Sequence, residues 1–113
     1  MNIIEEIKEN LKLEIRPKSM GTEYLEAVVD RNELELLQTI LIKHLGSAAK
    51  EPGEKANFPS EIEGLVSDLG GLRIGQSFFY KKVEITVFFA ALWPWESNPK
   101  KITLKVGRVK LQR

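Results

Sequence analysis

The segment FFYKKVEITVFFAA, residues 78–91, decides the class of this fold because its apolar side chains follow a period of two. That period is typical of β-strands, in which successive side chains point to opposite faces of a sheet. Apolar residues occupy even positions up to Tyr80 and odd positions from Val83 onward, so the inward parity changes between them. We therefore predict two strands joined by a tight turn or a bulge at Lys81–Lys82.

The C-terminal segment shows a second change of parity. The apolar residues within 102–106 fall on even positions, whereas Val109 and Leu111 fall on odd ones. Gly107 lies at the change, and glycine is favoured in a β-bulge that needs a positive φ. The pattern predicts a last strand with a bulge at Gly107 or Arg108.

The N-terminal part predicts a helix followed by a hairpin. Asn2 is a favourable N-cap for a short first helix. From Leu11 the apolar period changes to two and stops at Pro17, which indicates a strand, and residues 24–29 repeat the pattern. The turn-like residues between these segments predict that the two strands pair antiparallel.

A central helix is predicted from Arg31 to Leu45. Asp30 and Glu33 have the spacing of a capping box, and Gly46 is a typical helix stop. Apolar side chains cover about 240° of this helix, which is more than a surface helix needs. We therefore expect the helix to be covered on two sides or to contact another subunit, and we predict self-association.

The middle of the chain completes the predicted element order. Residues 46–59 indicate a long loop, and Ser60 with Glu63 predicts a capping box for a helix that ends at Gly70. The order is α-β-β-α-α-β-β-β in a single domain, residues 1–113. Because hairpins are grouped, we expect an α+β fold with a mainly antiparallel sheet of about five strands and two to three helices on one face.

The sequence contains few groups that carry out chemistry. The absence of cysteine excludes disulfides, thiolate metal centres and cysteine nucleophiles. His44, the only histidine, is interpreted as a residue that hydrogen-bonds a carbonyl at its helix end, and Glu84 as part of a solvated sheet face. No nucleotide-binding or phosphate-binding motif has the required spacing. Since partners for acid-base chemistry and for a nucleophile are missing as well, we expect no enzyme activity and no cofactor.

Membrane and export signals are not expected either. The N-terminal residues are too charged for the apolar centre of a signal peptide. The longest apolar run, residues 85–95, is about half the roughly 20 residues that span a bilayer. We therefore expect a soluble, cytoplasmic protein with no membrane partner.

Charge is distributed unevenly along the chain. Residues 1–71 carry eight Lys and Arg against fourteen Asp and Glu, whereas residues 72–113 carry nine against two. The basic part also holds seven of the nine aromatic residues. This asymmetry indicates an anionic or oppositely charged partner.

Two candidate binding surfaces follow from the basic, aromatic part. The candidate protein interface, chosen because tryptophan is enriched at binding hot spots, consists of Phe88, Trp93 and Trp95. The candidate anion-binding residues are Lys100, Lys101, Lys105, Arg108 and Lys110. We expect a non-enzymatic module that binds a protein partner or assembles with itself as a homo-oligomer. The alternative is a small nucleic-acid-binding protein whose cations follow phosphates and whose rings stack on bases.

Overall fold

The computed structural model describes residues 2–21, 23–55 and 57–111 of the chain. It confirms the predicted α+β class, with three helices, a five-stranded antiparallel sheet and the predicted element order. The elements are α1 (Ile3–Asn10), β1 (Leu13–Ile15), β2 (Tyr24–Asp30), a 3₁₀ turn (Arg31–Glu33), α2 (Leu34–Leu45), α3 (Ser60–Asp68), β3 (Ser77–Val83), β4 (Thr86–Pro94) and β5 (Lys101–Lys110).

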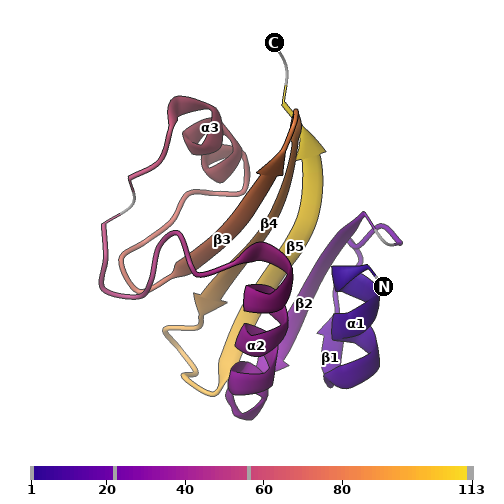
Figure 1. Cartoon of the computed structure of the whole chain (residues 1–113). Coiled ribbons are helices and arrows are strands. Elements are labelled where there is room, and N and C mark those ends of the chain that lie inside the picture. The colour runs from indigo at the N-terminus through magenta and orange to yellow at the C-terminus, as the bar shows by residue number, and fades with distance from the viewer. Residues whose placement is uncertain (1, 22, 56, 112–113) are drawn as a thin grey trace.

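The sheet has the strand order β1-β2-β5-β4-β3, so the last strand lies at its centre (Figure 1). β5 pairs with β2 on one side and with β4 on the other, and every pairing is antiparallel. The long connection between β2 and β3, which contains α2 and α3, therefore leads from one half of the sheet to the opposite edge. β5 is the strand that joins the two hairpins.

Both faces of the sheet are covered, and each has its own hydrophobic cluster. Residues of α1 and α2, such as Ile7 and Leu41, pack on Leu104 and its neighbours across the sheet. Residues of α3, such as Leu65, pack with Phe89 on the other face. We call the two surfaces the α1/α2 face and the α3 face. The sequence predicts helices on one face, and the structure places two helices there and the third on the opposite face.

The wide apolar arc of α2 is largely explained by internal packing. Leu37, Leu41 and most of the apolar residues of this helix are buried, whereas Leu36 and Ile42 remain 43% and 50% exposed. The predicted helix start at Arg31 is a 3₁₀ turn, Arg31–Glu33, and α2 follows from Leu34. The carboxylate of Asp30 caps this turn by accepting a hydrogen bond from the Asn32 N–H. The main argument for self-association was this apolar arc, and packing within one chain already covers most of it. Self-association therefore stays a prediction.

The predicted capping boxes are wrong, whereas the first cap is confirmed. Asn2 accepts a hydrogen bond from the Ile4 N–H at 2.7 Å, as expected for an N-cap. The carboxylate of Glu33 instead accepts the Lys12 N–H at 3.2 Å and so connects two segments distant in sequence. Ser60 is already inside α3, where Pro59 is the N-cap without a side-chain hydrogen bond.

The predicted turn or bulge at Lys81–Lys82 is also wrong. β3 continues through both lysines, and the chain reverses at Glu84–Ile85, where Glu84 has a φ of 56°. β3 and β4 pair so that even residues face odd ones, as in Tyr80 opposite Phe89. A tight two-residue turn with this register changes the parity of the inward residues without any irregularity in the strand.

The predicted bulge at Gly107 or Arg108 is wrong as well. Ile102 to Lys110 pair with β4 in one unbroken register, and Gly107 has no positive φ. The apolar parity changes because Val106 faces α1 and α2, whereas Val109 faces α3. A strand that is buried on different faces along its length produces the same pattern as a bulge.

Candidate protein-interaction site

The register of the central strands separates the predicted site residues into two groups. Because alternate residues of a strand point to opposite faces, Trp93, Lys101 and Lys105 lie on the α3 face. Phe88 lies on the α1/α2 face, and Arg108 and Lys110 share that face by the same register. The two remaining candidates, Lys100 and Trp95, lie in the connection between β4 and β5. The five cations therefore do not form one continuous track.

Lys105 on the α3 face is engaged inside the molecule. Its Nζ lies 3.9 Å from the centre of the Trp93 ring and donates a hydrogen bond to the Leu69 carbonyl at 3.1 Å. A carboxylate oxygen of Glu26 is 4.0 Å away, and only 16% of either side chain is exposed. Burial lowers the pKa of Lys105, and the charge of Glu26 partly opposes this shift. Lys105 is therefore not free to bind an external anion.

The two tryptophans also make internal contacts. Trp93 packs against the cluster beneath α3, and its buried Nε1 has no hydrogen-bond partner among the described residues. Trp95 donates from Nε1 to the hydroxyl of Thr103 at 2.8 Å. Both rings remain partly exposed. Trp93 therefore helps to close the core on the α3 face, whereas Trp95 is held by its hydrogen bond to Thr103.

The other group forms a distinct surface at the end of the β3–β4 hairpin. Two rows of side chains run across β3, β4 and β5, and pairing places Phe88 between Lys81 and Arg108 in one row. Thr86 lies between Val83 and Lys110 in the other row. We call this surface the hairpin face; its residues are Lys81, Val83, Thr86, Phe88, Arg108 and Lys110. In Figure 1, α1 and α2 lie beside the lower part of the sheet, away from this hairpin end.

The hairpin face combines apolar area with positive charge. Val83 is 49% exposed, and Phe88 is half-buried. Within the described part of the chain, neither Lys81 nor Lys110 forms an ion pair. Arg108 contacts the carboxylate of Glu23 at 3.3 Å, a pair that is largely exposed. A surface with an apolar centre and a cationic border is suited to an acidic partner that also has apolar side chains.

A hollow of about 270 Å³ extends the hairpin face toward the helices. Its lining comes from β3 and β4, from the end of α2 and from the start of α1: Lys81, Val83, Phe88, His44, Leu45, Ile3 and the N-cap residue Asn2. His44 Nε2 lies 2.9 Å from a carboxylate oxygen of Glu6, so the histidine is bonded to α1 and not to a helix-end carbonyl. The same carboxylate contacts Lys43.

This carboxylate cluster predicts a pH effect on stability. Hydrogen bonds from Lys43, and then from His44, lower the pKa of Glu6. A lowered folded-state pKa stabilises the protein above the unfolded-state pKa of about 4.3, and this contribution disappears as the pH falls through the folded-state value. We expect Glu6→Gln to lower the melting temperature at pH 7, and the difference from wild type to shrink steadily below about pH 4. Thermal unfolding of both proteins across pH 3–7 checks this, and a difference independent of pH would contradict it.

Sequence reasoning missed half of the hairpin face. Lys81, Val83 and Thr86 were not candidates, because the parity change was assigned to a turn at the lysines. The signal that could have found them is the segment VEIT, residues 83–86, in which Val83 can pair with Thr86 across a two-residue turn. Glu84 lies in that turn, not on a sheet face.

Neither a metal-binding cluster nor a membrane-spanning helix is found among the described residues. Across residues 2–21, 23–55 and 57–111, no group of three or more His, Asp or Glu side chains is placed to hold a metal ion. In the same part of the chain, no helix combines the length and apolar character needed to cross a membrane.

Comparison with known proteins adds no relative. No protein-family model, curated protein or solved structure matched this chain. Any functional conclusion therefore depends on the surface itself.

Proposed function

We propose that this protein is a non-enzymatic interaction module that binds an acidic segment of another protein through the hairpin face. The observation that carries the proposal is the position of Phe88 and exposed Val83 among Lys81, Arg108 and Lys110. Burying such apolar side chains favours association, and the surrounding cations select for negative charge and accelerate encounter.

The arrangement supports a protein partner more than a nucleic acid. Binding to single strands depends on a groove that follows the phosphates and on several exposed rings. On the hairpin face the only aromatic residue is Phe88, and it is half-buried. The two tryptophans lie elsewhere, and Lys105 is occupied by Glu26 and Leu69.

A selection from displayed random peptides tests the proposal without a known partner. We expect the wild-type protein to enrich peptides that contain both acidic and apolar residues. The double variant Lys81→Glu/Lys110→Glu should bind these peptides at least about tenfold more weakly, because both contacts change from attraction to repulsion. The control is Lys12→Glu/Lys55→Glu, which changes the net charge equally at exposed sites outside the hairpin face. Neither pair should alter stability much, since exposed charges contribute little.

Three outcomes would contradict the proposal. Enriched peptides that bind both double variants equally would place binding elsewhere. A selection without enrichment would remove the main support. A single-stranded oligonucleotide that binds at low salt, and whose affinity decreases steeply with salt, would favour the nucleic-acid alternative. Light scattering on the same samples measures the predicted self-association.

A further inference from the structure

The central strand has an unpaired edge at its C-terminal end. β2 begins at Tyr24, which pairs with Gly107, so no β2 residue lies opposite Arg108 to Lys110 of β5. On its other side β5 continues to pair with β4 as far as Lys110. The sheet therefore has a notch beside β5, next to the hairpin face.

The direction of the backbone groups at this notch follows from two hydrogen bonds. The Leu111 N–H donates to the Ile85 carbonyl at 2.7 Å, so odd residues here bond toward β4. The Arg108 N–H donates to the Glu23 carbonyl at 3.3 Å, so even residues bond toward the β2 side. In an antiparallel ladder this alternation continues, and it directs the N–H and C=O of Lys110 into the notch.

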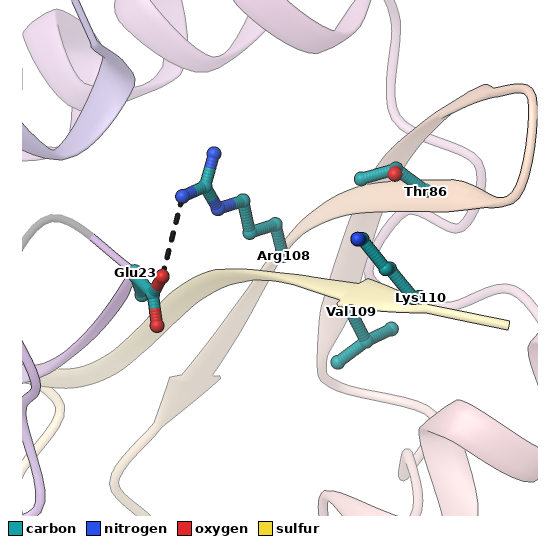
Figure 2. A pocket seen from close by; sticks show the side chains of 5 residues that line it. All are labelled: Glu23, Thr86, Arg108, Val109 and Lys110. Atoms are coloured by element: carbon teal, nitrogen blue, oxygen red, sulfur yellow. Dashed lines mark hydrogen bonds and ion pairs between the residues drawn. The ribbon is translucent and has the colours of Figure 1, made fainter.

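Two hollows of different chemistry lie on the two sides of the notch. On the α1/α2 face, a hollow of about 420 Å³ is lined by Thr86, Arg108 and Lys110 together with Glu23 and Val109. Figure 2 shows the side chains of Thr86, Arg108 and Lys110 on one side of β5 and that of Val109 on the other. The first hollow is therefore positively charged.

The second hollow is on the α3 face. It has a volume of about 500 Å³ and lies between α3 and the end of β5, where Leu65, Val109 and Leu111 give it an apolar floor. Glu61 and Asp68 of α3 and Lys110 of β5 also line it. Gly64 of α3 also lines it, and a Cβ added at Gly64 would meet no atom within 4 Å. A basic hollow and a hollow with an apolar floor and charged residues around it thus lie on opposite faces of one open strand edge.

The two outer edges of the sheet are better protected. On β3, Phe78 exchanges backbone hydrogen bonds with Lys50 of the preceding loop, and exposed Lys81 and Lys82 follow. Charged side chains and covering loops are common means of preventing further strand pairing. β1 is only three residues long. The notch beside β5 therefore differs from both edges, because a hollow lies on each side of it in which a partner side chain could be placed.

We propose that an extended segment of the partner adds to the sheet at this notch, antiparallel to β5, with acidic and apolar side chains in alternation. The residue opposite Lys110 exchanges two main-chain hydrogen bonds with it and directs its carboxylate toward Arg108 and Lys110. Its neighbours in the segment point to the α3 face and place an apolar side chain beside Leu65 and Val109. This inference depends on the proposed function and specifies how the partner is recognised.

The existing pair between Arg108 and Glu23 does not block this mode of binding. The Glu23 side chain is 65% exposed and that of Arg108 is 47% exposed. An exposed ion pair contributes at most about 1 kcal/mol, so exchange of Glu23 for a partner carboxylate costs little. The short paired length indicates weak, transient binding.

Synthetic peptides test the inference directly. The probe is a blocked peptide of about eight residues in which Glu and Val alternate, and the matched control has the same composition with all Glu residues before all Val residues. A second control is the alternating peptide methylated on its backbone nitrogens, which cannot donate main-chain hydrogen bonds. Amide chemical shifts of the ¹⁵N-labelled protein are followed during titration with each peptide.

We expect the alternating peptide to shift the amide signals of residues 108–111 and to bind at least about tenfold more tightly than either control. Gly64→Phe should abolish this preference by filling the apolar hollow, while the protein remains folded because the site is open. Lys110→Glu should also weaken binding of the alternating peptide.

Equal binding of the three peptides would overturn strand addition. So would chemical-shift changes on the hairpin face that leave the Lys110 amide unaffected. Either result leaves the proposed function intact if peptides from the display selection still require Lys81 and Lys110. If the alternating peptide does not bind but the peptides from the display selection do, only the strand-addition mode is rejected.

Discussion

Replacing Lys50 with methionine should lower the free energy of unfolding by about 1–2 kcal/mol, because the carbonyls around its buried ammonium would lose a donor. Lys50 is 1% exposed. Its Nζ donates to the backbone carbonyls of Glu51 at 3.3 Å, Ile74 at 3.1 Å and Gln76 at 2.5 Å. Three acceptors match the three protons of an ammonium group.

Methionine is the informative substitution because it keeps the length and much of the apolar contact of the lysine stem. The loss then comes mainly from the Gln76 carbonyl, because the Ile74 carbonyl still accepts the Gly53 N–H at 2.6 Å and the Glu51 carbonyl still accepts the Glu54 N–H at 3.1 Å. An unsatisfied buried carbonyl costs about 1–3 kcal/mol. Removal of a buried charge offsets part of this cost, because burial disfavours the ammonium form and so lowers the pKa of Lys50.

Urea unfolding of Lys50→Met beside Lys55→Met measures the effect. Lys55 belongs to the same loop and is exposed, so its substitution should change stability by no more than about 0.5 kcal/mol. The Lys50 variant should unfold at a lower urea concentration with an unchanged slope. Equal stability of the two variants would show that the loop does not depend on the ammonium.

Lys50 also shows what sequence reasoning could not find. A lysine between Gly46 and Pro59 has the appearance of a solvated loop residue, and lysine is almost never fully buried unless it is paired. Two of its three partners are main-chain carbonyls 24 and 26 residues later in the chain, and no local pattern identifies them. The long loop is therefore anchored to the start of β3, which is a tertiary effect.

The elements themselves were predictable because their signals are local. Asn2, Asp30 and Gly46 mark helix ends by their own backbone and side-chain chemistry, and the structure places ends at or beside them. A period of two identified every strand. The fold class follows from these signals and their order along the chain.

The candidate site was only partly predictable, because it depends on which face each side chain occupies. Phe88, Arg108 and Lys110 were identified as candidates, but sequence alone grouped them with Trp93 and Lys105, which face the opposite side. A sheet covered on both faces gives apolar residues at both parities. Only the register of β3, β4 and β5 shows which residues are neighbours.

Gly107→Ala should lower the free energy of unfolding by about 2 kcal/mol through crowding. A Cβ at this position would lie 2.9 Å from Tyr24 Cδ1, 3.1 Å from the Glu23 carbonyl oxygen and 3.1 Å from Phe89 Cζ. Because Gly107 has no positive φ, the backbone itself tolerates alanine. Glycine is thus required here by the two rings that close over β5.

The sign of the stability change distinguishes crowding at Gly107 from the usual gain when alanine replaces glycine. Gly64→Ala in α3, where the added Cβ meets nothing within 4 Å, should raise stability by about 0.5–1 kcal/mol. If Gly107→Ala were stabilising as well, the close approach of Tyr24 and Phe89 would not constrain the strand.

A double-mutant cycle with Phe89→Leu identifies the ring responsible. The leucine substitution alone should destabilise the core by about 1–2 kcal/mol, since Phe89 is 2% exposed. It also removes Phe89 Cζ, which would lie 3.1 Å from the new Cβ, so Gly107→Ala should cost less in the Phe89→Leu background than in wild type. Urea unfolding of the four proteins gives the coupling. Strict additivity of the two substitutions would assign the crowding to Tyr24 and the Glu23 carbonyl instead. In that case the residues at the start of β2, and not Phe89, would exclude a side chain at Gly107.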